Sequence, residues 1–154
     1  MGMKRMLPLA LALVFPAFLA PVHAVDGTVA TEETPLFQSG ETTDLGELRW
    51  KYRPVIVFAD SVDDPRFIEQ MALLERDADA LRERDILVFT DTTPEPKGTL
   101  RTDLRPRGFM MVLVGKDGGV KLRKPVPWDV RELSRVIDKM PMRQQEIRDR
   151  RGSE

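Results

Sequence analysis

The chain has 154 residues, no cysteine and one histidine, and its 24 basic and 25 acidic residues leave a net charge of −1. Without cysteine there is no thiolate, so thiol oxidoreductase and thiol peroxidase activities are excluded. Basic and acidic residues are interspersed along the chain. It therefore lacks the excess of basic residues that is typical of proteins that bind nucleic acid or anionic membranes. We therefore expect neither of these as a partner.

The first 24 residues have the pattern of a secretory signal peptide. Lys4 and Arg5 precede an apolar stretch over residues 6–20, and small residues lead to a cleavage point after Ala24. A membrane anchor is the alternative, but about 15 apolar residues fall short of the roughly 20 that a spanning helix needs. Cleavage would leave 130 residues (154 less 24), without His23, and a net charge of −3 (22 basic against 25 acidic). We expect a periplasmic or secreted protein that has no membrane contact after cleavage.

The remaining chain is long enough for one domain with an ordinary apolar core, because a domain of this size buries about two-thirds of its unfolded surface. Residues 25–43 are rich in Thr, Glu and Gly and lack apolar periodicity, which predicts a flexible leader. The domain is expected over residues 44–150. The polar end of the chain from Met142 predicts a frayed helical tail, with residues 151–154 disordered.

The first half of the domain predicts a helix, a strand and a second helix. Asp44 with Glu47 resembles a capping box and indicates a short helix over residues 44–50, with Leu45 and Leu48 facing inward. The apolar run over residues 54–59 predicts a strand buried on both faces. Apolar residues at spacings of three and four then predict one amphipathic helix over residues 66–83, started by an aspartate cap and a proline.

The second half predicts strands at residues 86–90 and 109–114, with one or two helical turns at 100–104 between them. A strand, helix and strand in succession form a right-handed unit with parallel strands. The turn containing Asp117 and Gly118 predicts a hairpin whose second strand covers residues 120–123. A final helix is predicted from about Trp128 to Met140.

This β-α-β…β-β-α order predicts an α/β fold, a thioredoxin-like three-layer sandwich with a mixed four-stranded sheet. Thioredoxin-like oxidoreductases place their reactive thiolate on the first turn of the first sheet-covering helix, where the helix dipole lowers its pKa. Residues 61–66 occupy that position and contain no sulfur. The fold is thus predicted without its nucleophile.

Polar side chains gather where the parallel strands are expected to end, which is the edge at which open α/β sheets bind ligands. The candidate ligand-binding residues are Asp60, Asp63, Asp64, Arg66, Asp91 and Arg107. The arginines, with Arg105, are suited to clamp a carboxylate or phosphate in a bidentate way. The plainer interpretation is that they pair with the aspartates around them.

The aspartates in this set allow three interpretations. One of them caps the helix, which we favour and which stabilises a helix by about 1 kcal/mol. Four of them can offer oxygen ligands to calcium, although their spacing does not match an EF-hand loop. Two of them can act as an acid/base pair for hydrolysis, which requires a defined separation. We predict no catalytic residue, no metal and no cofactor.

Four segments resemble a known family: Trp50, DDPRF (63–67), GFMMVLVGKDGGVKLR (108–123) and DKMPMRQQEIRDR (138–150). They are similar to the domain of unknown function 4174, over residues 44–150. That family is described as thioredoxin-like or peroxiredoxin-like, without catalytic cysteines, in exported bacterial proteins and in extracellular sushi-repeat proteins of animals. The resemblance implies the fold and export, and no activity. The residues that match its motif carry no assigned role: Asp63, Asp64, Arg66, Lys116, Asp117, Lys121 and Arg123.

The sequence therefore predicts a non-catalytic exported thioredoxin-like module that binds a protein or glycan partner and has no thiol redox activity. The alternative is a small-ligand-binding or hydrolytic protein that uses the aspartates and arginines at the carboxyl ends of the parallel strands. A calcium-stabilised variant is the third possibility.

Overall fold

The structure is a computed structural model that describes residues 34–41 and 43–153. The predicted signal peptide and residues 25–33 and 42 of the predicted leader lie outside these residues. Within the described part, no helix is long and apolar enough to cross a membrane.

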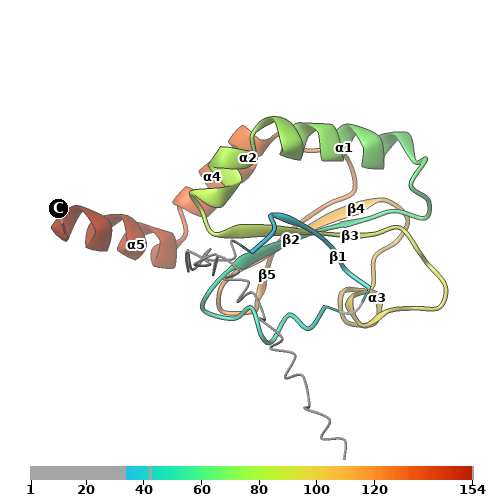
Figure 1. Cartoon of the computed structure of the whole chain (residues 1–154), viewed down its shortest axis with the longest axis horizontal. Helices are drawn as coiled ribbons and strands as arrows, with labels where there is room; N and C mark the ends of the chain where they lie inside the picture. The colour runs from blue at the N-terminus through green and yellow to red at the C-terminus, as the bar shows by residue number, and fades with distance from the viewer. Residues whose placement is uncertain (1–33, 42, 154) are drawn as a thin grey trace, which may run out of the picture. The chain divides into compact units, whose positions relative to one another are not determined.

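Five strands form one mixed sheet in the order β1-β3-β2-β4-β5 (Figure 1). Their bounds are β1 (Phe37–Ser39), β2 (Arg53–Phe58), β3 (Ile86–Asp91), β4 (Met110–Val114) and β5 (Val120–Lys124). β1 and β2 each run parallel to β3, whereas β4 runs antiparallel to both β2 and β5. The predicted fold class and the predicted order of strands and helices along the chain are confirmed, and β1 adds a fifth strand to the predicted four.

Helices cover both faces of the sheet (Figure 1). One face carries α1 (Pro65–Arg76), α2 (Ala78–Arg82) and α4 (Val130–Asp138), and the other carries α3 (Thr99–Leu104). The last helix, α5 (Pro141–Gly152), follows α4. The central strands are continuous apolar runs because neither of their faces meets water.

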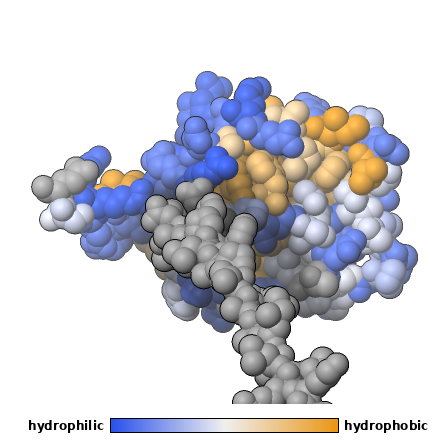
Figure 2. Space-filling view, viewed as in Figure 1, coloured by the Kyte–Doolittle hydropathy of each residue, from blue (hydrophilic) through white to orange (hydrophobic). Residues whose placement is uncertain are grey.

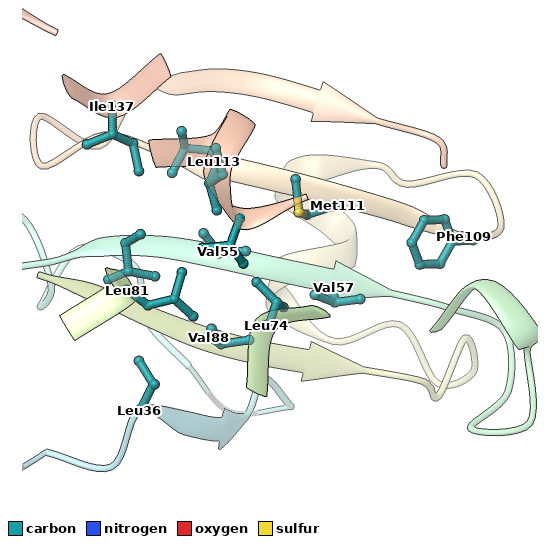
Figure 3. Close-up of a cluster of buried hydrophobic side chains, with 13 residues drawn as sticks. Leu36, Val55, Val57, Leu74, Leu81, Val88, Phe109, Met111, Leu113 and Ile137 are labelled. Carbon is teal, nitrogen blue, oxygen red and sulfur yellow. The ribbon is translucent and has the colours of Figure 1, made fainter. Parts of the chain in front are cut away.

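Alternate residues of β2 point to the two faces and divide the core into two clusters. Val55 and Val57 pack with Leu74 of α1 and Leu81 of α2, and Figure 3 shows these side chains gathered between the sheet and the helices. The second cluster contains Ile56 and Phe58 of β2 and the leucines of α3. Both faces of β2 are therefore fully buried.

β1 lies inside the range predicted as a flexible leader, so that prediction is wrong for this part of the range. Leu36 is buried, and its carbonyl accepts a hydrogen bond from the N–H of Val88 at 2.7 Å. Gly40 donates to the carbonyl of Thr90 at 2.8 Å. Three strand residues in a polar segment are too few to show a periodicity, and it is the pairing with β3 that orders them.

Residues 45–51 form turns, so the short helix predicted over residues 44–50 is wrong. The Asp44 carboxylate does accept a hydrogen bond, but from the N–H of Gly46, which is the local turn that competes with helix formation. Leu45 and Leu48 nevertheless pack against the second core cluster, as predicted. Trp50 closes the segment with a φ of +68° and a side chain that is 64 % exposed.

The single helix predicted over residues 66–83 is two helices, because Asp77 leaves the helical conformation with φ −114° and ψ 34°. Aspartate is a poor residue for a helix interior, since its carboxylate competes for backbone and neighbouring donors. Here that carboxylate pairs with Arg76 at 3.2 Å. The predicted apolar stripe is correct at Leu74 and Leu81, which are buried on either side of the break, but not at Ile68, which is 56 % exposed.

The C-terminal segment is a regular helix through Gly152, so the predicted helical tail is confirmed, whereas its fraying and the disorder at residues 151 and 152 are not borne out. Pro141 takes the first helical position, which suits its fixed φ. Arg143 and Glu146 tie the helix to the rest of the domain through ion pairs, and the Arg143 side chain is only 2 % exposed.

The surface in Figure 2 carries a group of apolar side chains over α1. A hollow of about 590 Å³ between α1 and β1 is lined by apolar residues that include Phe37, Phe67, Ile68 and Met71. Ile68 is 56 % exposed there. This hollow lies along one edge of the sheet.

Candidate functional site

The candidate site is the edge of the sheet where the parallel strands β2 and β3 end. The Ala59 N–H donates to the carbonyl of Asp91 at 3.0 Å and joins the two strand ends. The chain then turns through residues 60–64 into α1. The segment 61–66 therefore lies at the predicted position, at the carboxyl edge of the sheet and without sulfur.

The first turn of α1 is neutralised internally. Asp64 is the N-cap, and its carboxylate accepts from the backbone N–H of Arg66 at 2.9 Å. The Arg66 guanidinium pairs with the same carboxylate at 2.9 Å and lies 5.5 Å from the ring of Phe109. The side-chain hydrogen bond to Arg66 lowers the pKa of Asp64 and raises the pKa of Arg66. The cap carboxylate thus offsets a cation in the first turn, where the helix dipole disfavours one.

Asp91 forms a buried ion pair with Arg101 of α3. The Nε of Arg101 donates to Oδ1 of Asp91 at 2.8 Å, and the two side chains are 6 % and 3 % exposed. The Nη2 of Arg101 donates to the carbonyls of Ala59 at 2.5 Å and of Asp91 at 3.0 Å. The guanidinium also lies 5.4 Å from the ring of Phe58. Arg101 therefore locks α3 onto the ends of both parallel strands.

An open groove of about 550 Å³ begins beside this ion pair. We call it the rim groove and define it by the charged side chains along its walls, Asp60, Glu95, Lys97, Arg101, Arg105 and Arg107. The side chains of Lys97, Arg105 and Arg107 are exposed and make no ion pair with any residue in the described ranges. Arg105, which ends α3, takes a left-handed conformation with φ +48°.

The six predicted residues do not form one cluster. Asp60 and Arg107 line the rim groove. Asp91 does not line it, but pairs with Arg101, which does. Asp64 and Arg66 pair with each other. Asp63 is exposed and is not among the residues that line the rim groove.

Sequence reasoning missed Arg101, the residue that organises the site. One signal was present: a buried apolar strand ends in an aspartate, which needs a cation, and Arg101 lies between two leucines of a short helix. Across residues 34–41 and 43–153, no three His, Cys, Asp or Glu side chains are placed to hold a metal ion.

A second charged cluster lies at the opposite end of β2, which we call the α5 network. Arg53, the first residue of β2, is 1 % exposed and donates to Glu146 of α5 at 2.8 Å. Lys116 pairs with the same carboxylate at 2.9 Å and with Asp85 at 2.8 Å. Burial favours the protonated form of Glu146, but the hydrogen bonds from Arg53 and Lys116 outweigh it and lower its pKa to about 2. This network attaches α5 to the sheet.

The sequence of the chain matches one described protein family. The sequence profile of the domain of unknown function DUF4174 matches residues 44–146. The chain belongs to the DUF4174 family. The match includes both the residues of the rim groove and the start of α5, as far as Glu146. It names no activity.

Solved structures identify the fold of this DUF4174 domain. The reduced 2-Cys peroxiredoxin of Plasmodium vivax is 16 % identical, with a TM-score of 0.53, and the match covers 67 % of this chain and 85 % of that one. A chloroplastic thioredoxin z is 19 % identical, with a TM-score of 0.49, covering 67 % and 90 % of the two chains. The peroxiredoxin match shows the fold alone. The DUF4174 domain is thus thioredoxin-like and has no cysteine.

Proposed function

We propose that this protein is an exported, non-catalytic binding module that holds a partner molecule, protein or glycan, at the rim groove and has no thiol redox activity. The observation that supports it most is the presence of three exposed cations, Lys97, Arg105 and Arg107, at the ligand-binding edge of the fold. None of them makes an ion pair within the described residues, so their charges are available to a partner.

The carboxylates favour binding over hydrolysis. A carboxyl group that transfers protons near neutral pH needs a raised pKa, which usually comes from burial. Asp60 is 64 % exposed at its side chain, and Glu95 is exposed as well. Asp64 and Asp91 are held in ion pairs. The groove therefore lacks a buried, unpaired carboxyl group, among the residues described, that would serve as an acid.

Binding of a small ligand at the same groove is the weaker alternative. Its volume lies in the range of ligand pockets, but such pockets are mostly apolar, with few polar groups. The rim groove is instead lined mainly by charged side chains, several of them exposed. A groove of this kind is better suited to bind a group carried by a larger partner molecule than a free small ligand.

Export is supported by the tripartite pattern of residues 1–24. Mass analysis of the protein recovered from the exported fraction tests it. We expect a mature chain that begins at Val25. Recovery of the unprocessed chain in the cytoplasm would contradict export.

In-cell crosslinking tests partner binding. A photoreactive amino acid at Thr102, which is exposed and lines the groove, should capture a partner, whereas the same probe at Arg131 on α4 should not. Replacing Arg105 and Arg107 with Glu should abolish capture from Thr102. Turnover of a hydrolase substrate by the purified protein, lost in Asp60→Ala, would contradict a non-catalytic role, as would equal capture from both positions.

A further inference from the structure

We propose that the rim groove is a carboxylate-binding site with Arg101 as its floor, and that it holds an acidic segment of a partner protein. This inference deepens the proposed function and rests on it for the location of the site.

Arg101 has one side of its guanidinium free. A guanidinium carries five N–H groups. The Nε donates to Asp91, and the Nη2 donates to the carbonyls of Ala59 and Asp91. The Nη1 makes no hydrogen bond with a described residue, and it lies 3.9 Å from Oδ1 of Asp60. Although the side chain as a whole is only 6 % exposed, the Nη1 is not among the fully buried atoms that lack a partner, and Arg101 lines the rim groove. The two N–H groups of the Nη1 therefore face the groove, where an acceptor supplied from outside can reach them.

This donor is already oriented. The ion pair with Asp91, the two carbonyls and the ring of Phe58 fix the Arg101 side chain in one conformation. A fixed side chain loses little conformational entropy when a ligand binds, so more of the interaction remains as affinity. An arginine presented in this way also suits the planar geometry of a carboxylate.

The walls of the groove add a positive charge. Lys97, Arg105 and Arg107 join Arg101 there, against Asp60 and Glu95 as the anions of the groove. The unpaired cations come from two separate segments, one before α3 and one after it. An acidic peptide carries successive carboxylates, so it can place one against each segment.

Asp60 argues for a carboxylate rather than a phosphate. Its Oδ1 lies 3.9 Å from the Nη1 of Arg101, so any anion bound at the Nη1 lies close to this negative charge. Repulsion grows with the charge of the ligand, and a carboxylate carries one charge whereas a phosphate near neutral pH carries more. Asp60 and Glu95 can in turn accept hydrogen bonds from the backbone N–H groups of a bound peptide.

Fluorescence anisotropy on the purified chain tests the assignment, with a labelled tetraglutamate peptide as probe. We expect saturable binding that is about ten-fold tighter than that of the tetraglutamine peptide and that weakens as salt rises from about 50 mM to about 500 mM. The Arg105→Gln, Arg107→Gln double variant should bind about ten-fold more weakly. The Arg82→Gln, Arg131→Gln pair removes the same charge from exposed positions outside the groove and should leave binding unchanged.

The Arg101→Lys variant tests the contribution of the free Nη1 group to peptide binding. Lysine keeps a charge for Asp91 but has no Nη1, so binding should weaken while the circular dichroism spectrum shows the chain folded. Equal binding of the two peptides, or equal loss in the groove pair and the control pair, would overturn the assignment. Inorganic phosphate or an oligogalacturonate that displaces the peptide at lower concentration than free glutamate peptide does would also overturn it, in favour of that ligand.

The carboxylate site and the proposed function can fail independently of each other. If capture from Thr102 is lost in the Arg105→Glu, Arg107→Glu variant but the purified chain binds the tetraglutamate and tetraglutamine peptides equally, the binding module stands and the carboxylate site fails. If the peptide binds as expected but no partner is captured in the cell, the carboxylate site stands and the proposed function fails.

Discussion

Replacing Glu146 with Gln should destabilise the domain by about 3 kcal/mol at pH 7. Glu146 is the shared acceptor of Arg53 and Lys116, and its pKa is lowered from 4.5 to about 2. At about 1.4 kcal/mol for each pH unit, that difference corresponds to about 3 kcal/mol of stability in the ionised state. The value lies at the lower end of the 3–5 kcal/mol typical of breaking a buried ion pair, as expected when Arg53 keeps only the more distant Asp85, at 3.9 Å, as a counter-charge.

The same pKa fixes how the effect depends on pH. A carboxyl group whose pKa is lowered in the folded state stabilises the fold fully above its unfolded value, here 4.5, and loses that contribution as the pH falls to about 2. The difference in unfolding free energy between the natural chain and Glu146→Gln should therefore shrink from about 3 kcal/mol at pH 7 toward zero near pH 2. Subtracting the two chains removes the contributions of Asp64, Asp117 and Asp138, whose pKa values are also lowered.

Urea unfolding followed by circular dichroism at a series of pH values measures this difference. Glu132→Gln is the matched control, because Glu132 pairs with Arg135 on an exposed part of α4, and a surface pair contributes at most about 1 kcal/mol. A difference for Glu146→Gln that is below that of the control at pH 7, or that does not change with pH, would refute the reasoning.

Three further substitutions probe separate features. Asp91→Asn leaves the buried Arg101 with only the exposed Asp60, 3.9 Å away, as a counter-charge and should cost about 3–5 kcal/mol in urea unfolding, and a loss below 1 kcal/mol would contradict the role of this pair. Gly118→Ala should lower stability by about 1 kcal/mol, because φ is +80° and the new Cβ would lie 3.0 Å from the Nε of Arg49; an unchanged melting temperature would contradict this. Trp50→Gly should leave the melting temperature unchanged or raise it, since it relieves a positive φ at an exposed residue, and a clear fall would mean that the indole packs.

Sequence alone predicted the elements whose signal is local. The apolar runs of β2, β3 and β4 follow from burial on both faces, and the Asp117-Gly118 turn follows from the φ that a tight hairpin demands. β1 was missed because three residues show no period, and only β3 gives them hydrogen-bonding partners. The order of α5 was missed because its anchor, Glu146, is 93 residues away from Arg53.

The sequence predicted where in the fold the candidate site lies, but not which of its charged residues pair with one another. The carboxyl ends of parallel strands identify the edge of the sheet from topology, which the sequence reveals. Which charges pair across that edge depends on side-chain geometry: Asp91 is held by Arg101, and Asp64 by Arg66. The cations left without partners are therefore known only after the fold is built.

The two edge strands have a consequence for the behaviour of the protein at high concentration. An open strand edge can template growth of the sheet from one molecule to the next. β1 offers only three residues, Phe37–Ser39, so an incoming strand would gain few hydrogen bonds. β5 is longer but carries Lys121, Arg123 and Lys124, so a second copy of β5 would meet like charge along its length. The short length of β1 therefore limits growth of the sheet at one edge, and electrostatic repulsion limits it at β5. These features matter in a chain that has no disulfide to resist misassembly.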